Sequence, residues 1–214
     1  HMKTILSACV PRREVLSGEL REDMFAAKLK NVIEGNADPV YQDADVFFKN
    51  TFPTDGLLSL VREVCGRLSG KRPNSNAFIR LETAFGGGKT HNLIALHHIA
   101  SGSTPEGVTG LVTSEMVPHS GSSWAIAGIV GNDMDPSNGL IHGEVTVRTI
   151  WGEIAWQIGG RPAYELVRQS DEQMVAPGSQ VLEMICGDKP TLIMIDELAR
   201  HLRQGKAVTT ANGN

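Results

Sequence analysis

The sequence has no long apolar run and few cysteines. No stretch of its 214 residues approaches the roughly 20 apolar residues needed to cross a bilayer. The start also lacks the apolar core of a secretion signal, so we expect a soluble, cytoplasmic protein with no membrane partner. The cysteines Cys9, Cys65 and Cys186 are far apart and odd in number, which suits a reducing cytosol better than a disulfide framework.

Positive charge is not in excess either. The chain carries 20 lysines and arginines against 24 aspartates and glutamates, a formal net charge of -4. This balance gives no global basic field for nucleic acid, although a local basic groove stays open. Arg200, Arg203 and Lys206 form one modest basic cluster, which a solvated helix end explains equally well.

The sequence does contain three consecutive glycines between two regular patterns. Residues 82–90, ETAFGGGKT, follow a short apolar run at 77–81 and precede a helical pattern. This order of strand, loop and helix is the context that a phosphate-binding loop requires. Residues without a side chain let the backbone wrap closely around an anion, and the helix start adds unpaired amides and the positive end of its dipole. The segment therefore predicts a site for the phosphates of ATP.

The residues at the end of this segment have distinct expected roles. Lys89 would reach the β- and γ-phosphates, and the Thr90 hydroxyl would ligate Mg²⁺. The pattern G-x-x-x-x-G-K-T is incomplete, because Thr83 occupies the position of its first glycine. The alternative is a glycine-rich turn with a surface lysine. The residues that we expect to bind the nucleotide are Phe85, Gly86, Gly87, Gly88, Lys89, Thr90 and His91.

A second segment supplies two adjacent carboxylates. Residues 191–197, TLIMIDE, form a short buried-strand pattern that ends in Asp196 and Glu197. Ligands of open α/β sheets bind at this carboxyl edge of the strands. Asp196 would hold Mg²⁺ through water. Glu197 would orient and deprotonate the water that attacks the γ-phosphate. Glu197 and Lys89 are the expected catalytic residues. A helix N-terminus also favours acidic residues, and both interpretations can hold together.

The periodic patterns predict the fold class and its parts. We expect an α/β protein, a P-loop NTPase fold of three α/β/α layers with a mostly parallel sheet, preceded by helices. Its expected parts are an N-terminal helical segment at 1–75, an ATPase core at 76–208 and a polar tail at 209–214. Helices are expected at 20–33, 54–69, 89–101, 104–116 and 150–158, and two more are expected to begin at 162 and at 177. Strands are expected at 77–81, 124–130 and 191–196. Connections without regular structure are expected at 38–50 and 135–143.

Two adjacent histidines, His97 and His98, suggest a metal pair at first sight. Adjacent positions on a helix point about 100° apart, so the two rings suit one ion poorly. The simpler interpretation is a pair with one side chain in the core and one at the surface.

Several segments together resemble a large family of bacterial and archaeal ATPases, domain of unknown function 499. The segments that carry the resemblance include Phe47-Phe48 with Thr51, residues 85–91 (FGGGKTH), residues 149–153 (TIWGE) with Gly159-Gly160, residues 176–178 and residues 196–198. The resemblance implies a P-loop, AAA-like ATPase domain at the N-terminal end of a longer protein, often found beside DNA methyltransferases and restriction or phage-defence components. It also implies protein partners, and it leaves DNA contact and a homo-oligomer open.

The residue after the magnesium aspartate bears on the reaction. In the AAA+, RecA and ABC ATPases that this chain resembles, an acidic residue there is the usual base, which implies ATP hydrolysis with Mg²⁺. Only 18 residues follow Asp196, and they hold no candidate for the next strand, which carries a polar sensor residue. We therefore expect an incomplete sheet that binds ATP poorly and hydrolyses it slowly. A non-hydrolysing regulatory nucleotide-binding module is an alternative, and a P-loop kinase is a less favoured one.

Overall fold

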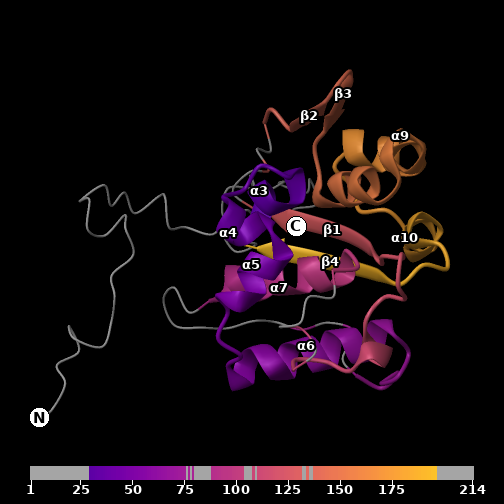
Figure 1. The fold of residues 1–214 in the computed structure, drawn as a ribbon. Coiled ribbons are helices and arrows are strands. Elements are labelled where there is room, and N and C mark those ends of the chain that lie inside the picture. The colour runs from indigo at the N-terminus through magenta and orange to yellow at the C-terminus, as the bar shows by residue number, and fades with distance from the viewer. Residues whose placement is uncertain are drawn as a thin grey trace, which may run out of the picture.

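The structure is a computed structural model that describes residues 29–75, 77, 79, 88–103, 108, 110–131, 134 and 137–196. These residues form a mixed α/β fold with one parallel and one antiparallel pair of strands (Figure 1). The elements in chain order are α3 (Leu29–Glu34), α4 (Pro39–Gln42), α5 (Ala44–Lys49), α6 (Asp55–Leu68), α7 (Lys89–Ala100), η2 (Ser114–Met116), β1 (Ala125–Val130), β2 (Leu140–His142), β3 (Val145–Val147), α9 (Ile150–Glu172), α10 (Ser179–Cys186) and β4 (Thr191–Asp196).

The parallel pair of β1 and β4 lies at the centre of the fold. The strands pair from their first to their last residues, so their carboxyl ends are level. Side chains alternate between the two faces of a strand. Ile126 and Met194 therefore join the core that α7 lines, whereas Ile129 packs with Ile154 of α9 on the other face. Helices α7 and α9 cover opposite faces of the pair, as Figure 1 shows. The expected strands at 124–130 and 191–196 are confirmed.

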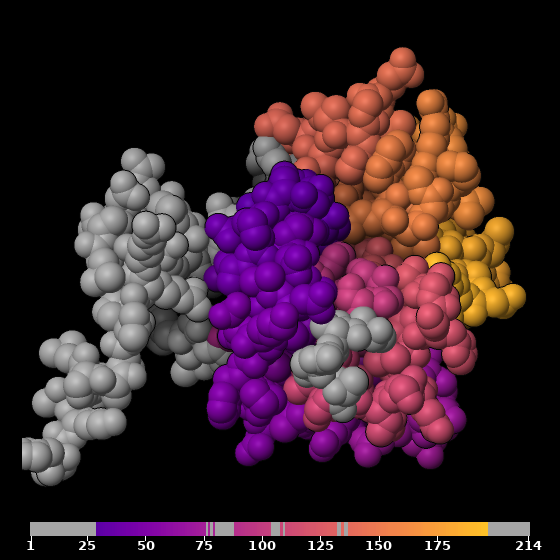
Figure 2. Space-filling model, in the orientation of Figure 1, coloured from indigo at the N-terminus to yellow at the C-terminus, as the bar shows by residue number. Residues whose placement is uncertain are grey.

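The helices before α7 pack on it through an apolar core. Phe47 and Phe48 are buried in this core, as expected for an anchor. The Thr54 hydroxyl accepts a hydrogen bond from the Leu57 amide at 3.2 Å and so caps α6. Gly70, with φ of +74°, follows the end of that helix, which confirms both predicted boundaries. Figure 2 shows the indigo surface of α3 to α5 as one continuous block down the front of the molecule.

Two expected connections contain regular structure instead. The prediction for 38–50 is wrong, because Asp38 and Asp43 cap the short helices α4 and α5 by accepting from the Val40 and Val46 amides. The prediction for 135–143 is wrong at its end, where β2 pairs with β3 across a two-residue turn. Both helices and both strands are too short for a periodic pattern to appear in the sequence.

Helix α9 contains the predicted break. Gly160 has φ of 62° and ψ of -151°, which are not helical values, so two helical spans meet there. The first span begins at Thr149, whose hydroxyl accepts from the Gly152 amide at 3.1 Å. The second span contains Pro162, as expected for a helix opening. The predicted pair of helices with a glycine break is therefore confirmed.

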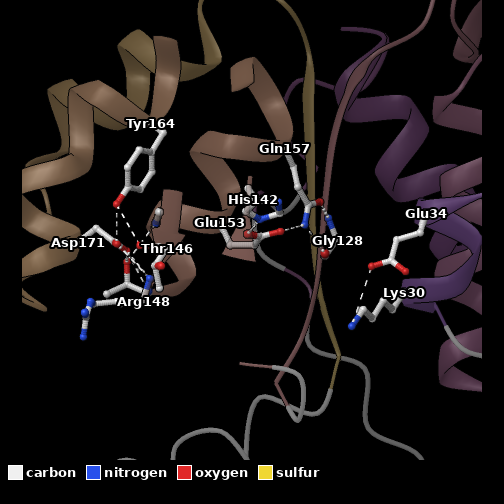
Figure 3. Close-up of polar contacts among 12 residues, drawn as sticks. Lys30, Glu34, Gly128, His142, Thr146, Arg148, Glu153, Gln157, Tyr164 and Asp171 are labelled. Carbon is white, nitrogen blue, oxygen red and sulfur yellow. Dashed lines mark hydrogen bonds and ion pairs between the residues drawn. The ribbon is translucent and has the colours of Figure 1, made fainter. Parts of the chain in front are cut away.

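The outer edge of β1 is paired by a side chain of α9. The Gly128 amide donates to Gln157 Oε1 at 2.8 Å, and Gln157 Nε2 donates to the Gly128 carbonyl at 2.9 Å (Figure 3). The same Nε2 donates to Glu153 Oε1 at 2.8 Å, and Glu153 Oε2 bonds His142 Nε2 at 2.6 Å. This chain of bonds joins the β2–β3 hairpin to the sheet, and it satisfies backbone groups that an edge strand would leave unpaired.

The remaining expectations are met in part. Val108 is helical and Ser114–Met116 form the 3-10 helix η2, so the predicted helix at 104–116 is present only as short turns among the described residues. Ala77 and Ile79 are the described members of the expected 77–81 strand, and neither is in a strand. The rest of that strand, residues 1–28 and residues 197–214 lie outside the described residues. No helix in the described part of the chain is long and apolar enough to span a membrane.

Candidate functional site

The site predicted from the sequence lies at the start of α7. Gly88 precedes the helix with φ of +75°, a left-handed conformation that glycine adopts without steric cost. The Asn92 amide donates to the Gly88 carbonyl at 2.9 Å, which closes the first turn. The first amides of a helix have no partner within it, and a glycine has no side chain with which to accept from them. The helix start therefore has donors suited to an anionic ligand.

Asp196 also lies at the start of α7, although it is far from that helix in the sequence. It is the last residue of β4 and shares the strand face of Met194, which looks toward α7. The Thr90 hydroxyl donates to Asp196 Oδ2 at 2.8 Å. The structure thus brings together the two residues that the sequence predicts as metal ligands, at the carboxyl edge of the parallel pair.

The donor set of this pair suits one kind of metal. A hydroxyl and a carboxylate are hard oxygen ligands, and two oxygens on one octahedral Mg²⁺ lie about 3 Å apart when each is about 2.1 Å from the metal. The observed separation of 2.8 Å between Thr90 Oγ1 and Asp196 Oδ2 is close to that value. The described residues include no group of three or more His, Cys, Asp or Glu that could hold a metal by itself. Mg²⁺ commonly uses one or two protein ligands together with phosphates, so the pair fits that mode.

The side chain of His91 contacts α5. Its ring stacks on Phe47 with centroids 4.4 Å apart and planes at 30°. Its Nε2 lies 2.9 Å from Thr51 Oγ1, and that hydroxyl donates its one hydrogen to the Phe47 carbonyl at 2.6 Å. His91 Nε2 is therefore the donor to Thr51. Burial lowers the pKa of His91, which agrees with a neutral ring in this tautomer. Nucleotide contact by His91 stays a prediction.

The other predicted site residues fall into two groups. Lys89 is half-buried and is the first residue of α7. Phe85, Gly86, Gly87 and Glu197 lie outside the described residues. The structure therefore describes Gly88, Lys89, Thr90, His91 and Asp196 of the predicted set.

Of the two adjacent histidines, His98 is buried and His97 is half-buried. His98 is 4% exposed and its Nε2 donates to the Tyr41 carbonyl at 2.7 Å. Burial lowers the pKa of His98, against a smaller opposing effect of this hydrogen bond and of Asp43. Burial, with the neighbouring His98, lowers the pKa of His97 to about 4. Both rings are therefore neutral near pH 7. His98 is the core member of the predicted pair, and His97 is only half-buried.

A buried carboxylate that the sequence pattern did not single out holds the start of α9. Asp171 is fully buried and accepts from the Thr149 amide at 2.8 Å, the Arg148 amide at 3.0 Å and the Tyr164 hydroxyl at 3.0 Å (Figure 3). The Thr149 hydroxyl also donates to it. Burial and the bond to Asp171 raise the pKa of Tyr164. The spacing of Tyr164, Val167 and Asp171 on one helix face is the signal that could have revealed a buried acid.

Comparison with known families adds one finding. A family model described as the DUF499 N-terminal domain matches residues 9–211. The chain belongs to this family. No curated protein and no solved structure matches it. Two of the segments that carry the resemblance to DUF499 have structural roles in this fold. Phe47 and Thr51 hold the ring of His91, and residues 149–153 form the start of α9.

Proposed function

We propose that this DUF499 N-terminal domain binds ATP with Mg²⁺ and hydrolyses it, as the P-loop module of a larger AAA-like protein. The observation that carries the proposal is the 2.8 Å contact of Thr90 Oγ1 with Asp196 Oδ2. It joins the first turn of a helix that follows the glycine-rich sequence to the carboxyl end of a parallel strand. Phosphate sites of open α/β proteins are built from these two elements.

Each residue has a role in the proposal. The loop residues 85–88 and the first amides of α7 would surround the phosphates, and Lys89 would contact the β- and γ-phosphates. Thr90 and Asp196 would hold Mg²⁺, which neutralises charge on the phosphates when bound. Glu197 would accept a proton from the attacking water. Protein partners in a larger assembly, a homo-oligomer, DNA contact and a link to restriction or phage defence belong to the proposal as well.

A regulatory module that holds ATP without hydrolysing it is the second candidate. The observation that favours it is Thr83, which stands where the phosphate-loop pattern has its first glycine. Measured turnover separates the two candidates, since only the first predicts release of phosphate. A P-loop kinase is less favoured, because it does not need the acidic residue at 197.

Nucleotide binding is tested by calorimetric titration of the chain with ATP and MgCl₂. A matched pair of variants, Lys89→Ala and Lys49→Ala, removes the same charge at the site and at the exposed last turn of α5. A hydrogen bond to a charged group contributes about 1.5–3 kcal/mol, so Lys89→Ala should weaken binding about 10- to 100-fold. Lys49→Ala should bind as the wild type does. Equal affinities of the wild type and Lys89→Ala would contradict the proposal, as would no binding by the wild type at millimolar ATP.

A further inference from the structure

One aromatic side chain stands in solvent beside the proposed site. Phe52 is 80% exposed, the largest exposed fraction among the large apolar side chains of the described residues. The two phenylalanines just before it, Phe47 and Phe48, are buried at 1% and 5%. Helix α5 therefore buries two aromatic rings, and the segment that joins it to α6 exposes the third.

The backbone around Phe52 is held on both sides. The Phe52 carbonyl accepts from the Thr54 amide at 2.9 Å, across Pro53, whose ring fixes its own φ. On the other side, the Thr51 hydroxyl donates to the Phe47 carbonyl at 2.6 Å. Thr54 in turn caps α6. Few backbone states are left for Phe52, so a ligand that contacts its ring would order little of the chain on binding.

This segment is attached to the start of α7. Thr51, next to Phe52 in the chain, accepts from His91 Nε2 at 2.9 Å, and His91 is next to Thr90. In Figure 1 the link from α5 to α6 lies at the left of the view, the same side as the carboxyl ends of β1 and β4. The helix start proposed to hold phosphates is thus joined through His91 to Thr51, and Phe52 follows Thr51 directly in the chain.

We infer that Phe52 stacks on the base of the nucleotide whose phosphates bind at Thr90 and Asp196, and that the Thr51–His91 bond positions it there. The inference rests on the proposed function and adds the residue that contacts the base. A phenyl ring offers a face to any base and no hydrogen bond to a base edge. ATP and GTP therefore bind with similar affinity, and both bind more tightly than inorganic tripolyphosphate.

The test compares Phe52→Ala with Ile141→Ala in titrations of the chain with MgCl₂ and either ATP or tripolyphosphate. Ile141 is 74% exposed on the β2–β3 hairpin, so its removal is a matched loss of exposed apolar surface. Stacking of a base on an aromatic side chain is worth about 1–3 kcal/mol, so Phe52→Ala should weaken ATP binding about 5- to 100-fold. Tripolyphosphate binding should stay unchanged, and Ile141→Ala should bind both ligands as the wild type does.

A second variant reports the contact directly. Phe52→Trp keeps an aromatic face, and its added indole emission should be quenched by ATP and not by tripolyphosphate. Thr51→Val, which removes the His91 partner, should weaken ATP binding more than tripolyphosphate binding. If Phe52→Ala binds ATP as tightly as the wild type, or loses affinity for both ligands equally, base stacking is refuted. If the wild type binds neither ligand, the proposed function fails, and the inference fails with it.

Discussion

The hydroxyl of Thr90 donates a hydrogen bond to Asp196 Oδ2 over 2.8 Å, although 106 positions separate the two residues in the chain. The bond connects α7 to β4 at the sheet edge where both elements meet the proposed ligand. Both residues of the predicted metal set are thus held by regular elements, Thr90 by a helix and Asp196 by a strand. Residues placed by rigid elements lose little freedom when they bind a ligand.

The first prediction concerns the dependence of ATP binding on magnesium. Thr90→Val and Asp196→Asn each remove one oxygen ligand or its charge, so each should weaken ATP binding in MgCl₂ at least about 10-fold. Binding in EDTA should change much less, because the metal no longer contributes. The double variant should be little worse than either single one, since the two residues act on one ion. Calorimetric titrations in the two buffers measure these differences.

The control for this prediction is Thr113→Val, which makes the same change at an exposed position. It should leave both titrations unaltered. Equal losses for Thr90→Val in MgCl₂ and in EDTA would show that the hydroxyl supports the fold and not a metal.

The second prediction concerns hydrolysis. Glu197→Gln keeps the shape of the side chain and removes the proposed base, so phosphate release should fall about 100-fold or more while ATP affinity stays within a few-fold. Glu183→Gln, an exposed change on α10, is the matched control. A loss of affinity without a loss of turnover would remove Glu197 from the base role. Turnover too low to measure in the wild type would favour the regulatory module.

Elements that leave a local signal could be predicted from the sequence. Helix α6 has a cap at Thr54, an apolar face and a glycine at 70, and its boundaries are confirmed. Strand β4 follows a proline and has four consecutive apolar residues, Leu192 to Ile195, and it too is confirmed. Helices α4 and α5 have four and six residues, which is less than two turns, so no periodic pattern could reveal them.

The candidate site was predictable where it follows a motif, and only there. Thr90 and Asp196 belong to recognisable segments, and the structure brings them together. The pairing of Gln157 with Gly128 could not be predicted, because a side chain that completes a strand edge depends on how α9 lies against β1. The same holds for the bond of Thr51 to His91, whose partners lie 40 positions apart.

The third prediction compares two helical glycines. A Cβ at Gly152 would lie 2.9 Å from Val147 Cγ1 and would also collide with Asp171, which its own hydrogen bonds hold in place. Gly152→Ala should therefore lower the free energy of unfolding by about 1–3 kcal/mol, although alanine favours helices. Gly56, in the first turn of α6, has no atom within 4 Å of such a Cβ. Gly56→Ala should raise stability by about 0.5–1 kcal/mol.

Urea denaturation of the wild type and of both variants measures these opposite signs. In thermal unfolding of a domain of this size, a change of 1 kcal/mol in the unfolding free energy shifts Tm by about 2–4 °C. Stabilisation by Gly152→Ala would mean that α9 can shift away from Asp171, and it would contradict the tight packing at this point.

The fourth prediction concerns pH. Burial lowers the pKa of His97 from 6.5 to about 4, and burial also lowers those of His91 and His98. Below about pH 6.5 these histidines are therefore protonated to a greater extent in the unfolded chain than in the folded one. Stability is complete above about pH 6.5 and falls as the pH drops toward 4, by up to about 1.4 kcal/mol per unit for each fully shifted group. The unfolding free energy should therefore be lower at pH 5 than at pH 7.

Substitution of His97 separates its share of this effect from that of the other two histidines. His97→Leu introduces an apolar side chain of similar bulk on α7 and removes the buried Nδ1, which has no hydrogen-bond partner among the described residues. The variant should lose less stability between pH 7 and pH 5 than the wild type, while His91 and His98 keep the remaining slope. Urea titrations at the two pH values supply both differences. If the unfolding free energy of His97→Leu depends on pH as strongly as that of the wild type, the pKa of His97 is not lowered by folding. A group whose pKa is lowered by folding takes up a proton on unfolding, and its removal must reduce the pH dependence of the unfolding free energy.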